Sequence, residues 1–368
     1  MIRATLSGLI LLLIAVVPAW SAFEYVVGLQ LRHFEDQARQ NWKGDAARPL
    51  ATYVWYPAED GVTMSEIAIP PGHPLFVGGL AARDAPIKSG LGQRPLIVLS
   101  HGTGGAGMQM MWLGRALAAR GFIAAAVDHH GNTAAEPAYD PRGFMLAWER
   151  ATDISRVIDR LVADPLFGPV IDPAQIGAAG FSLGGYTVIA LAGGRIDLAQ
   201  FAAFCASPQR DATCAPQPEF PEARAQFDAL RLTDPRVDQS LSRSGQSFRD
   251  PRLSSIVALA PVLGGAFTAT SLKAIESPVQ IIVGAGDRIA APASNAEPIA
   301  AAIPGAKLHI LGGDVGHYVF LDTCNAAGRR LVPVCADAAD VDREAVHQTV
   351  VELVAAHFAA TLAAPAAK

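Results

Sequence analysis

The sequence predicts an α/β protein with a mostly parallel central sheet, helices on both faces and a helical cap insertion. Short apolar runs alternate with helix-like segments from residue 95 onward. These runs are apolar throughout instead of alternating with polar residues, which is typical of strands buried on both faces. Glycine-rich turns follow several of the runs, as in successive β-α-β units.

Two β-rich stretches open the chain, and a loop is expected to separate them from the parallel part. EYVVGLQLRH and PLATYVWYP alternate partly between apolar and polar residues, which predicts an antiparallel start to the sheet. Residues 61–92 are rich in Pro and Gly, and we expect them to form a connecting loop.

The parallel part is predicted from six apolar runs and the helical segments between them. The predicted strands are PLIVLS, FIAAAVD, IGAAGF, SSIVALAPV, PVQIIVGAGD and KLHILGG. The predicted helices are MQMMWLGRALAAR, FMLAWERATDISRVIDRLVAD, LGGYTVIALAGG, a segment near ASNAEPIAAAIP, and DREAVHQTVVELVAAHFAATL. Arg150 and Asp153, at i and i+3 on the second helix, are expected to form a structural ion pair.

Residues 195–252 break this alternation. They are polar, contain several prolines and include one pair of cysteines. We interpret them as a helical cap inserted into the fold, and not as an independent domain.

Composition limits the class of partner. The 368 residues are 51% hydrophobic, which is enough for a large core, and their net charge is −5. The mild acidity and the lack of a Lys/Arg-rich run argue against a nucleic-acid partner. The sequence leaves the oligomeric state open.

The first residues are typical of a secretory signal. Arg3 precedes the uninterrupted apolar run Leu9–Val17, which is too short to span a bilayer comfortably. We expect cleavage after Ser21, so that 1–21 is a signal peptide and 22–368 the mature domain. The protein would then be secreted or periplasmic, without a stable membrane span. An uncleaved anchor helix is the alternative.

Four cysteines fit an exported protein. Cys205 and Cys214 are nine residues apart, and Cys324 and Cys335 are eleven apart. Four cysteines allow three connectivities, of which these two local disulfides are the simplest. A zinc site would favour shorter spacings such as C-x-x-C, which the sequence lacks. We therefore expect no metal.

Ser182 is the candidate nucleophile. Gly180-Phe181-Ser182-Leu183-Gly184 joins a predicted strand to a predicted helix, which is the context of the G-x-S-x-G nucleophile elbow. The two glycines allow the strand and the helix to approach closely. Because small residues are frequent in this chain, the pattern alone would also fit a serine without a catalytic role.

His317 is the candidate base. It lies in GGDVGHYVF, after the last predicted strand, where sites form in open α/β sheets. Serine needs such a base because its hydroxyl is a weak nucleophile at neutral pH. Other histidines at predicted strand ends precede Ser182, against the chain order of Ser, acid and His that accompanies this elbow. These alternatives are His101, His129 and His130.

Asp287 is the candidate acid, because it directly follows the strand in VQIIVGAGD and lies between Ser182 and His317 in the chain. A turn or a helix cap would also explain an aspartate at this place. Asp314 is the second choice. Its position three residues before His317 leaves little room for a separate supporting loop.

The oxyanion hole is predicted at two backbone N–H groups. One is that of Leu183, directly after the nucleophile. The other is assigned to Thr103 in His101-Gly102-Thr103-Gly104-Gly105, whose glycines permit unusual backbone angles. A plain glycine turn or a phosphate-binding loop is the alternative, although G-x-x-x-x-G-K-[ST] is absent.

These residues resemble the α/β-hydrolase superfamily, and especially the exported serine hydrolases related to dienelactone hydrolase and platelet-activating-factor acetylhydrolase. The stretches that carry the resemblance are RPLATYVWYP, PLIVLSHGTGG, FIAAAVDHHGNT, GFSLGG, VGAGDRIAAP and GVGHYVFLDTC. The resemblance implies an α/β-hydrolase fold, Ser182, Asp287 and His317 as the catalytic triad, Thr103 and Leu183 as oxyanion donors, and no cofactor. Dienelactone hydrolases carry cysteine at the elbow, so Ser182 favours ordinary carboxylic esters.

The expected function is therefore an exported serine esterase or lipase-like hydrolase. It would act through an acyl-enzyme on a small-molecule or lipid ester with a short or moderate acyl chain. An amidase or peptidase with the same triad is the first alternative. A non-catalytic binding protein on the same fold is the second.

Overall fold

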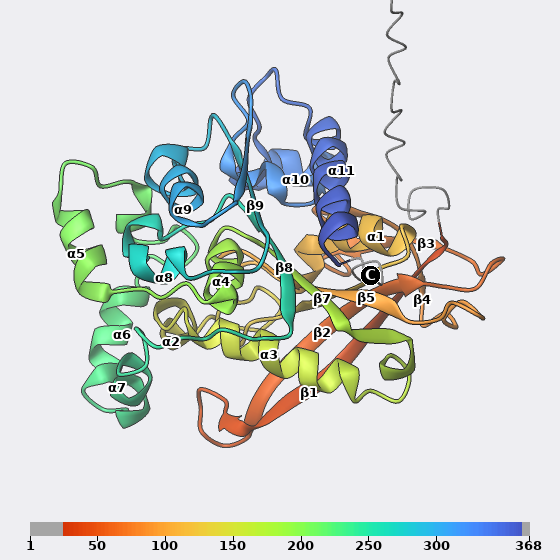
Figure 1. Cartoon of the computed structure of the whole chain (residues 1–368), viewed down its shortest axis with the longest axis horizontal. Helices are drawn as coiled ribbons and strands as arrows, with labels where there is room; N and C mark the ends of the chain where they lie inside the picture. The colour runs from red at the N-terminus through yellow and green to blue at the C-terminus, as the bar shows by residue number, and fades with distance from the viewer. Residues whose placement is uncertain (1–24, 363–368) are drawn as a thin grey trace, which may run out of the picture.

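A computed structural model of the chain describes residues 25–362, which form a single twisted sheet between two layers of helices (Figure 1). In this part of the chain the sheet has eleven strands. Their order is β10-β9-β8-β7-β5-β6-β2-β1-β4-β11, and β3 pairs with β4. The predicted signal peptide lies outside the described residues.

The centre of the sheet is parallel, as the apolar runs predict. Its strands, in spatial order, are β6 (Ile123–Val127), β5 (Arg94–Ser100), β7 (Ile171–Phe181), β8 (Leu253–Leu259), β9 (Val279–Gly284) and β10 (Lys307–Leu311). Beyond β6, the antiparallel strands β2 (Ala47–Pro57) and β1 (Val27–Gln40) extend the sheet. The predicted α/β architecture is confirmed.

Residues 61–92 are not only a connecting loop, so that part of the prediction is wrong. They contain β3 (Ser65–Ile69) and β4 (Phe76–Arg83), and β4 also pairs with the short β11 (Thr323–Cys324). A Cβ at Gly78 would lie 2.9 Å from both the Ile67 carbonyl oxygen and the Met111 Sδ. Glycine is thus used here for close packing within a strand, although locally it weakens the strand signal.

The helices cover both faces. α1 (Met111–Ala119) contacts α11 (Arg343–Leu362) on one face, and α3 (Glu149–Val162) contacts α4 (Leu183–Ala192) on the other. The remaining α-helices are α2 (Pro141–Met145), α5 (Leu198–Ala206), α6 (Ala223–Arg231), α7 (Pro235–Leu241), α8 (Ala269–Lys273), α9 (Ala296–Ala302) and α10 (Ala326–Leu331). No helix within residues 25–362 is both long and apolar enough to cross a bilayer.

The predicted helix at 144–164 is divided. α2 ends at Met145 and α3 begins at Glu149, so only the later part forms one long amphipathic helix. The buried side chains of α3 include Ile154, Val157 and Ile158, as their helical spacing indicates.

Residues 195–252 connect α4 to β8 and form α5, α6 and α7 at one end of the molecule (Figure 1). The Cys205–Cys214 disulfide closes the loop after α5, and Cys324–Cys335 is the second disulfide. α6 packs against α2, which follows the parallel strand β6 in the chain.

Candidate active site

Ser182 lies on a sharp turn between β7 and α4. β7 ends at Phe181 and α4 begins at Leu183, so Ser182 is the single residue between them. Its φ of 55° and ψ of −114° lie outside the regions that residues with a side chain ordinarily adopt. Such a conformation costs roughly 1–3 kcal/mol and persists where the surroundings enforce it. Here the Ser182 N–H donates a hydrogen bond to the Leu259 carbonyl at 2.9 Å.

The glycines on either side of Ser182 are needed for close backbone approach. A Cβ at Gly180 would lie 2.2 Å from the carbonyl oxygen of Gly184. A Cβ at Gly184 would lie 1.9 Å from the carbonyl oxygen of Ser100 on β5. Larger residues would therefore force β5, β7 and α4 apart.

The structure brings Ser182, His317 and Asp287 together. His317 Nε2 is 2.9 Å from Ser182 Oγ, and His317 Nδ1 is 2.7 Å from Asp287 Oδ2. Asp287 follows β9 and His317 follows β10, so the parallel strands bring both side chains to the same edge as Ser182. The exposed fractions are 7% for Ser182, 5% for His317 and 3% for Asp287, so the three groups are shielded from bulk water.

The hydrogen bonds around Asp287 fix the orientation of the imidazole. Asp287 Oδ1 accepts the backbone N–H groups of Ile289 at 2.9 Å and Ala290 at 2.7 Å. An ionised carboxylate can only accept, so Nδ1 of His317 carries the proton that points to Oδ2. His317 Nε2 then accepts the Ser182 hydroxyl proton. Asp314, the alternative acid, is exposed.

Two side chains that are far apart in the sequence, on α1 and α11, hold the short 3₁₀ helix that contains His317, η7 (His317–Phe320). Trp112 Nε1–H donates to the Phe320 carbonyl at 2.9 Å, and His347 Nε2–H donates to the Val319 carbonyl at 2.7 Å. Their rings stack with centroids 4.1 Å apart. Burial lowers the pKa of His347 to about 4, so its ring is neutral at neutral pH.

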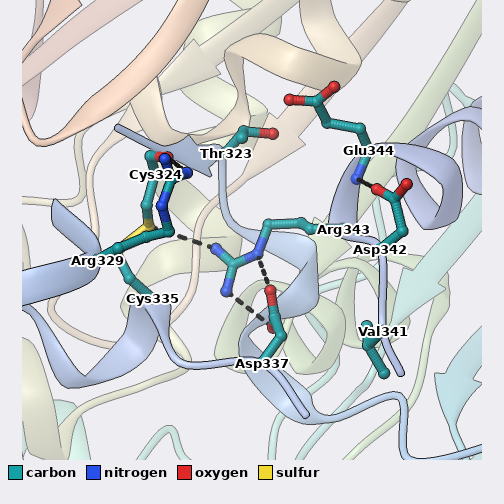
Figure 2. Close-up of a pocket in the computed structure, with 9 residues that line it drawn as sticks. All are labelled: Thr323, Cys324, Arg329, Cys335, Asp337, Val341, Asp342, Arg343 and Glu344. Carbon is teal, nitrogen blue, oxygen red and sulfur yellow. Dashed lines mark hydrogen bonds and ion pairs between the residues drawn. A yellow bond between two sulfur atoms is a disulfide. The ribbon is translucent and has the colours of Figure 1, made fainter. Parts of the chain in front are cut away.

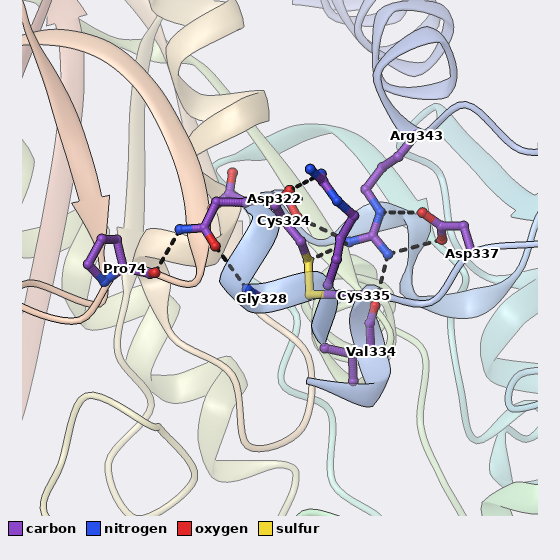
Figure 3. The surroundings of a disulfide bond; sticks show 10 residues. Pro74, Asp322, Cys324, Gly328, Val334, Cys335, Asp337 and Arg343 are labelled. Atoms are coloured by element: carbon purple, nitrogen blue, oxygen red, sulfur yellow. Dashed lines mark hydrogen bonds and ion pairs between the residues drawn. A yellow bond between two sulfur atoms is a disulfide. The ribbon is translucent and has the colours of Figure 1, made fainter. Parts of the chain in front are cut away.

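The segment after η7 is anchored around the second disulfide (Figure 3). Arg343 donates to the Asp322 carbonyl at 3.1 Å and to the Val334 carbonyl at 2.8 Å, and it forms an ion pair with Asp337. One guanidinium thus spans both ends of the loop that Cys324–Cys335 closes. This arrangement fixes the chain on the C-terminal side of His317.

The glycine-rich loop after β5 passes next to Ser182. A Cβ at Gly102 would lie 3.3 Å from the Ser182 Cβ. The Gly104 N–H donates to the Asn132 amide oxygen at 2.6 Å, and the Tyr139 hydroxyl donates to the Gly104 carbonyl at 2.8 Å. Between residues 25 and 362, neither the Thr103 N–H nor the Leu183 N–H has a hydrogen-bond acceptor. Both donors are therefore available to a ligand oxygen.

The comparisons with known proteins agree with this architecture. The "Alpha/beta hydrolase family" matches residues 97–328, which is more than half of the chain. This chain belongs to the alpha/beta hydrolase family. One similar solved structure is a ferulic acid esterase from Streptomyces cinnamoneus, with a TM-score of 0.59 and 20% sequence identity. The match covers 94% of this chain and 95% of that one. At this identity the likeness shows the fold alone. No curated protein matches the sequence significantly.

Two histidines weighed as alternative bases have other partners in this alpha/beta hydrolase. His129 lies between the Ser100 hydroxyl at 2.9 Å and Asp153 Oδ2 at 3.0 Å. Burial lowers its pKa to about 3, so it is neutral near pH 7. His130 Nδ1 lies 2.6 Å from the Glu136 carboxylate. Neither forms a hydrogen bond with Ser182.

The ion pair expected between Arg150 and Asp153 is wrong. Arg48 binds Asp153 through two nitrogens, at 2.7 and 3.0 Å, and Arg39 binds it at 2.6 Å. Burial alone would raise the pKa of Asp153, but these two cations hold it well below its usual range. Arg150 instead donates to the carbonyl of His101, at the start of the glycine-rich loop 101–105. This loop contains the predicted oxyanion donor Thr103 and is called the oxyanion loop below. Spacing along one helix could not reveal these partners of Asp153, because Arg39 lies on β1 and Arg48 on β2.

A cavity of about 210 Å³ lies beside the second disulfide (Figure 2). Its lining residues are Thr323, Cys324, Arg329, Cys335, Asp337, Val341, Asp342, Arg343 and Glu344. None of them is Ser182, Asp287 or His317 or belongs to the loop 101–105, so this cavity is separate from the candidate active site. Among residues 25–362 no group of three His, Cys, Asp or Glu side chains could hold a metal ion.

Proposed function

We propose that this chain is an exported serine carboxylic-ester hydrolase that acts through an acyl-enzyme on esters of short or moderate chain length. The hydrogen-bonded series from Ser182 Oγ through His317 to Asp287 carries the proposal. The strained elbow supports it, because it presents the Ser182 hydroxyl beside the edge where the loops of the parallel strands gather.

In the proposed reaction, Ser182 Oγ attacks the ester carbonyl carbon while His317 Nε2 takes the hydroxyl proton. The new C–O bond converts the carbonyl into a tetrahedral oxyanion, which the N–H groups of Thr103 and Leu183 stabilise. Asp287 accepts a hydrogen bond from Nδ1–H of His317 and stabilises the imidazolium, without taking its proton. His317 then returns the proton to the leaving alkoxide oxygen, the ester C–O bond breaks, and the alcohol departs.

Water completes the cycle. His317 Nε2 removes a proton from a water molecule, whose oxygen attacks the acyl carbon and forms a second oxyanion. When this intermediate collapses, the C–O bond to Ser182 breaks and His317 returns the proton to Ser182 Oγ. The carboxylic acid departs, and the enzyme is restored without a metal or cofactor.

The branch of the family is also a proposal. The stretches SHGTGG, VDHHGNT and GFSLGG favour the relatives of dienelactone hydrolase and platelet-activating-factor acetylhydrolase, with serine at the elbow favouring plain esters. The structural neighbour is described as a ferulic acid esterase, so aromatic esters belong among the first substrates to try.

The insertion 195–252 is proposed to act as a cap over the candidate active site. Export is supported by the composition of residues 1–21 and by two disulfides, which persist in oxidising compartments.

The decisive experiment compares purified wild-type protein with Ser182→Ala on a chromogenic short-chain ester. We expect kcat to fall by roughly 10³-fold or more, because the nucleophile is lost. A fluorophosphonate probe should label the wild type and leave the variant unlabelled. Full hydrolysis by the variant, or labelling that survives the substitution, would contradict the mechanism.

An amidase or peptidase could use the same triad, because acyl transfer is shared and only the leaving group differs. Rates on an ester and an amide with the same acyl group separate the two. We expect the ester to be hydrolysed faster. Equal or faster hydrolysis of the amide would assign the amidase function instead.

A further inference from the structure

The carboxylate of Glu219, from the insertion 195–252, lies against the oxyanion loop and interacts with the residues around His317. Glu219 lies between the Cys205–Cys214 disulfide and α6, on a part of the chain far in sequence from the oxyanion loop and from His317. A Cβ at Gly104 would lie 2.9 Å from the Cβ and 3.0 Å from the Cγ of Glu219. The Glu219 side chain therefore packs directly on the backbone one residue after Thr103.

Glu219 also interacts electrostatically with two residues of the segment that contains the candidate base. Its carboxyl interacts with the Tyr318 hydroxyl, and it would attract the imidazolium that His317 becomes during the reaction. Burial raises the pKa of Glu219, and the interactions with His317 and Tyr318 offset part of that rise. Within residues 25–362, Glu219 forms no ion pair with a lysine or arginine. No fixed cation of this part of the chain neutralises its charge.

Aromatic packing fixes this part of the cap. Phe220 lies with its ring centroid 5.3 Å from that of Phe144 on α2 and 6.0 Å from that of Tyr139. Tyr139 in turn donates its hydroxyl to the Gly104 carbonyl. Phe220, the residue after Glu219, is thus connected to the oxyanion loop through the ring and the hydroxyl of Tyr139.

We propose that Glu219 makes this site selective against esters that carry a negative charge near the scissile carbonyl, so that its substrates are neutral or cationic esters. The proposal rests on the esterase function above. An anionic group bound beside the oxyanion loop would lie on the same side of the site as the half-buried Glu219 carboxylate. Like charges repel each other more strongly there than in bulk solvent.

The test compares two esters of nearly the same size, dimethyl glutarate and monomethyl glutarate, at about pH 8, where the free carboxyl groups are ionised. Methanol release gives kcat/KM for each. We expect wild-type protein to prefer the neutral diester, and Glu219→Gln to reduce that preference by about three- to tenfold. Asp228→Asn removes the same charge from an exposed position of α6 and should leave the preference unchanged.

A measurement on the wild type keeps the proposal testable if Glu219→Gln does not fold. Raising the ionic strength screens a charge effect, so the preference for the diester should shrink with salt. A preference that neither the substitution nor salt changes would overturn the role of Glu219. Failure of the wild type to hydrolyse either ester would instead contradict the proposed esterase function.

Discussion

The guanidinium of Arg150 donates a hydrogen bond to the backbone carbonyl of His101, two residues before the proposed oxyanion donor Thr103. Arg150 is only 1% exposed, and its Nε and Nη1 have no partner within the described chain. Burial lowers its pKa to about 9, which still leaves it charged at neutral pH. A buried cation is thus held against the loop that we propose presents an N–H to the substrate.

We therefore predict that Arg150 is a positioning residue. Arg150→Met should lower kcat by about 10- to 100-fold with a smaller change in KM, because the oxyanion is bound chiefly in the transition state. Arg150→Lys should restore part of the loss. A purely structural role would instead reduce the fraction of protein molecules that are active. Titration of active sites with a fluorophosphonate therefore separates a positioning role from a structural one. Unchanged kcat per active site would contradict the prediction.

Asp287→Asn should leave the fold intact and lower kcat sharply. The amide would donate a hydrogen bond to Nδ1 and so favour the wrong tautomer of His317, in which Nε2 carries the proton. The corresponding change in a serine protease lowers kcat by roughly 10⁴-fold. Steady-state rates on a short-chain ester, with thermal melting as the folding control, test the prediction. Asp314→Asn is the matched control and should retain nearly full activity.

Gly184→Ala should destabilise the protein because the added Cβ would lie 1.9 Å from the Ser100 carbonyl oxygen. We expect a loss of about 2–4 kcal/mol in the free energy of unfolding, or failure to fold. Gly312→Ala is the control, since nothing lies within 4 Å of a Cβ there. Denaturant unfolding of both variants measures the difference. Equal stability would mean that β5 and α4 can separate without cost.

Removing the Cys324–Cys335 disulfide should destabilise the chain after η7. The paired Cys→Ser substitutions remove a cross-link that closes a short loop, which is worth about 3 kcal/mol in the chain-entropy model. Because Arg343 still binds both sides of that loop, we expect lower melting temperature but residual esterase activity. Differential scanning calorimetry with and without reductant is the measurement. A variant as stable as the oxidised wild type would contradict the prediction.

Stability should fall in mild acid because of buried neutral histidines. Burial lowers the pKa of His129 to about 3 and those of His347 and His357 to about 4. The unfolded chain binds their protons near pH 6.5, so the folded state loses stability as the pH falls from about 6.5 to about 4. Asp128 acts in the opposite sense, since burial raises its pKa to about 6. It offsets part of the loss.

Urea unfolding between about pH 4 and pH 7 gives this slope. His347→Gln keeps a donor for the Val319 carbonyl and removes one titrating group. Its stability should therefore depend less steeply on pH than that of the wild type. An unchanged slope would show that His347 does not contribute to the acid sensitivity.

Sequence patterns predict the features of this molecule that depend on neighbours along the chain. The central parallel strands are mostly apolar and buried, and Ser182, Asp287 and His317 each follow a parallel strand. β10, the edge strand before His317, is partly exposed. Features that depend on segments far apart escape this reasoning. Arg150 binds the loop that follows β5. Glu219 approaches the site from an insertion whose sequence has no recognisable motif.

Strands β3 and β4 show the same limit. A glycine between Ile67 and Met111 weakens the local strand signal, yet tertiary packing requires it. Compositional reasoning interprets such a stretch as a loop, whereas the register of β4 against β1 and β11 is decided by partners distant in the sequence.

The pairing of β4 with β11 has a consequence for how the protein can be trimmed. β11 begins three residues after η7, and the Asn325 amide donates to the Pro74 carbonyl at 2.7 Å. The family match begins only at residue 97. A recombinant fragment cut to the matching segment would lack β4, the strand that pairs with β11 just after His317. Domain boundaries for expression are therefore better placed before β1 and after α11.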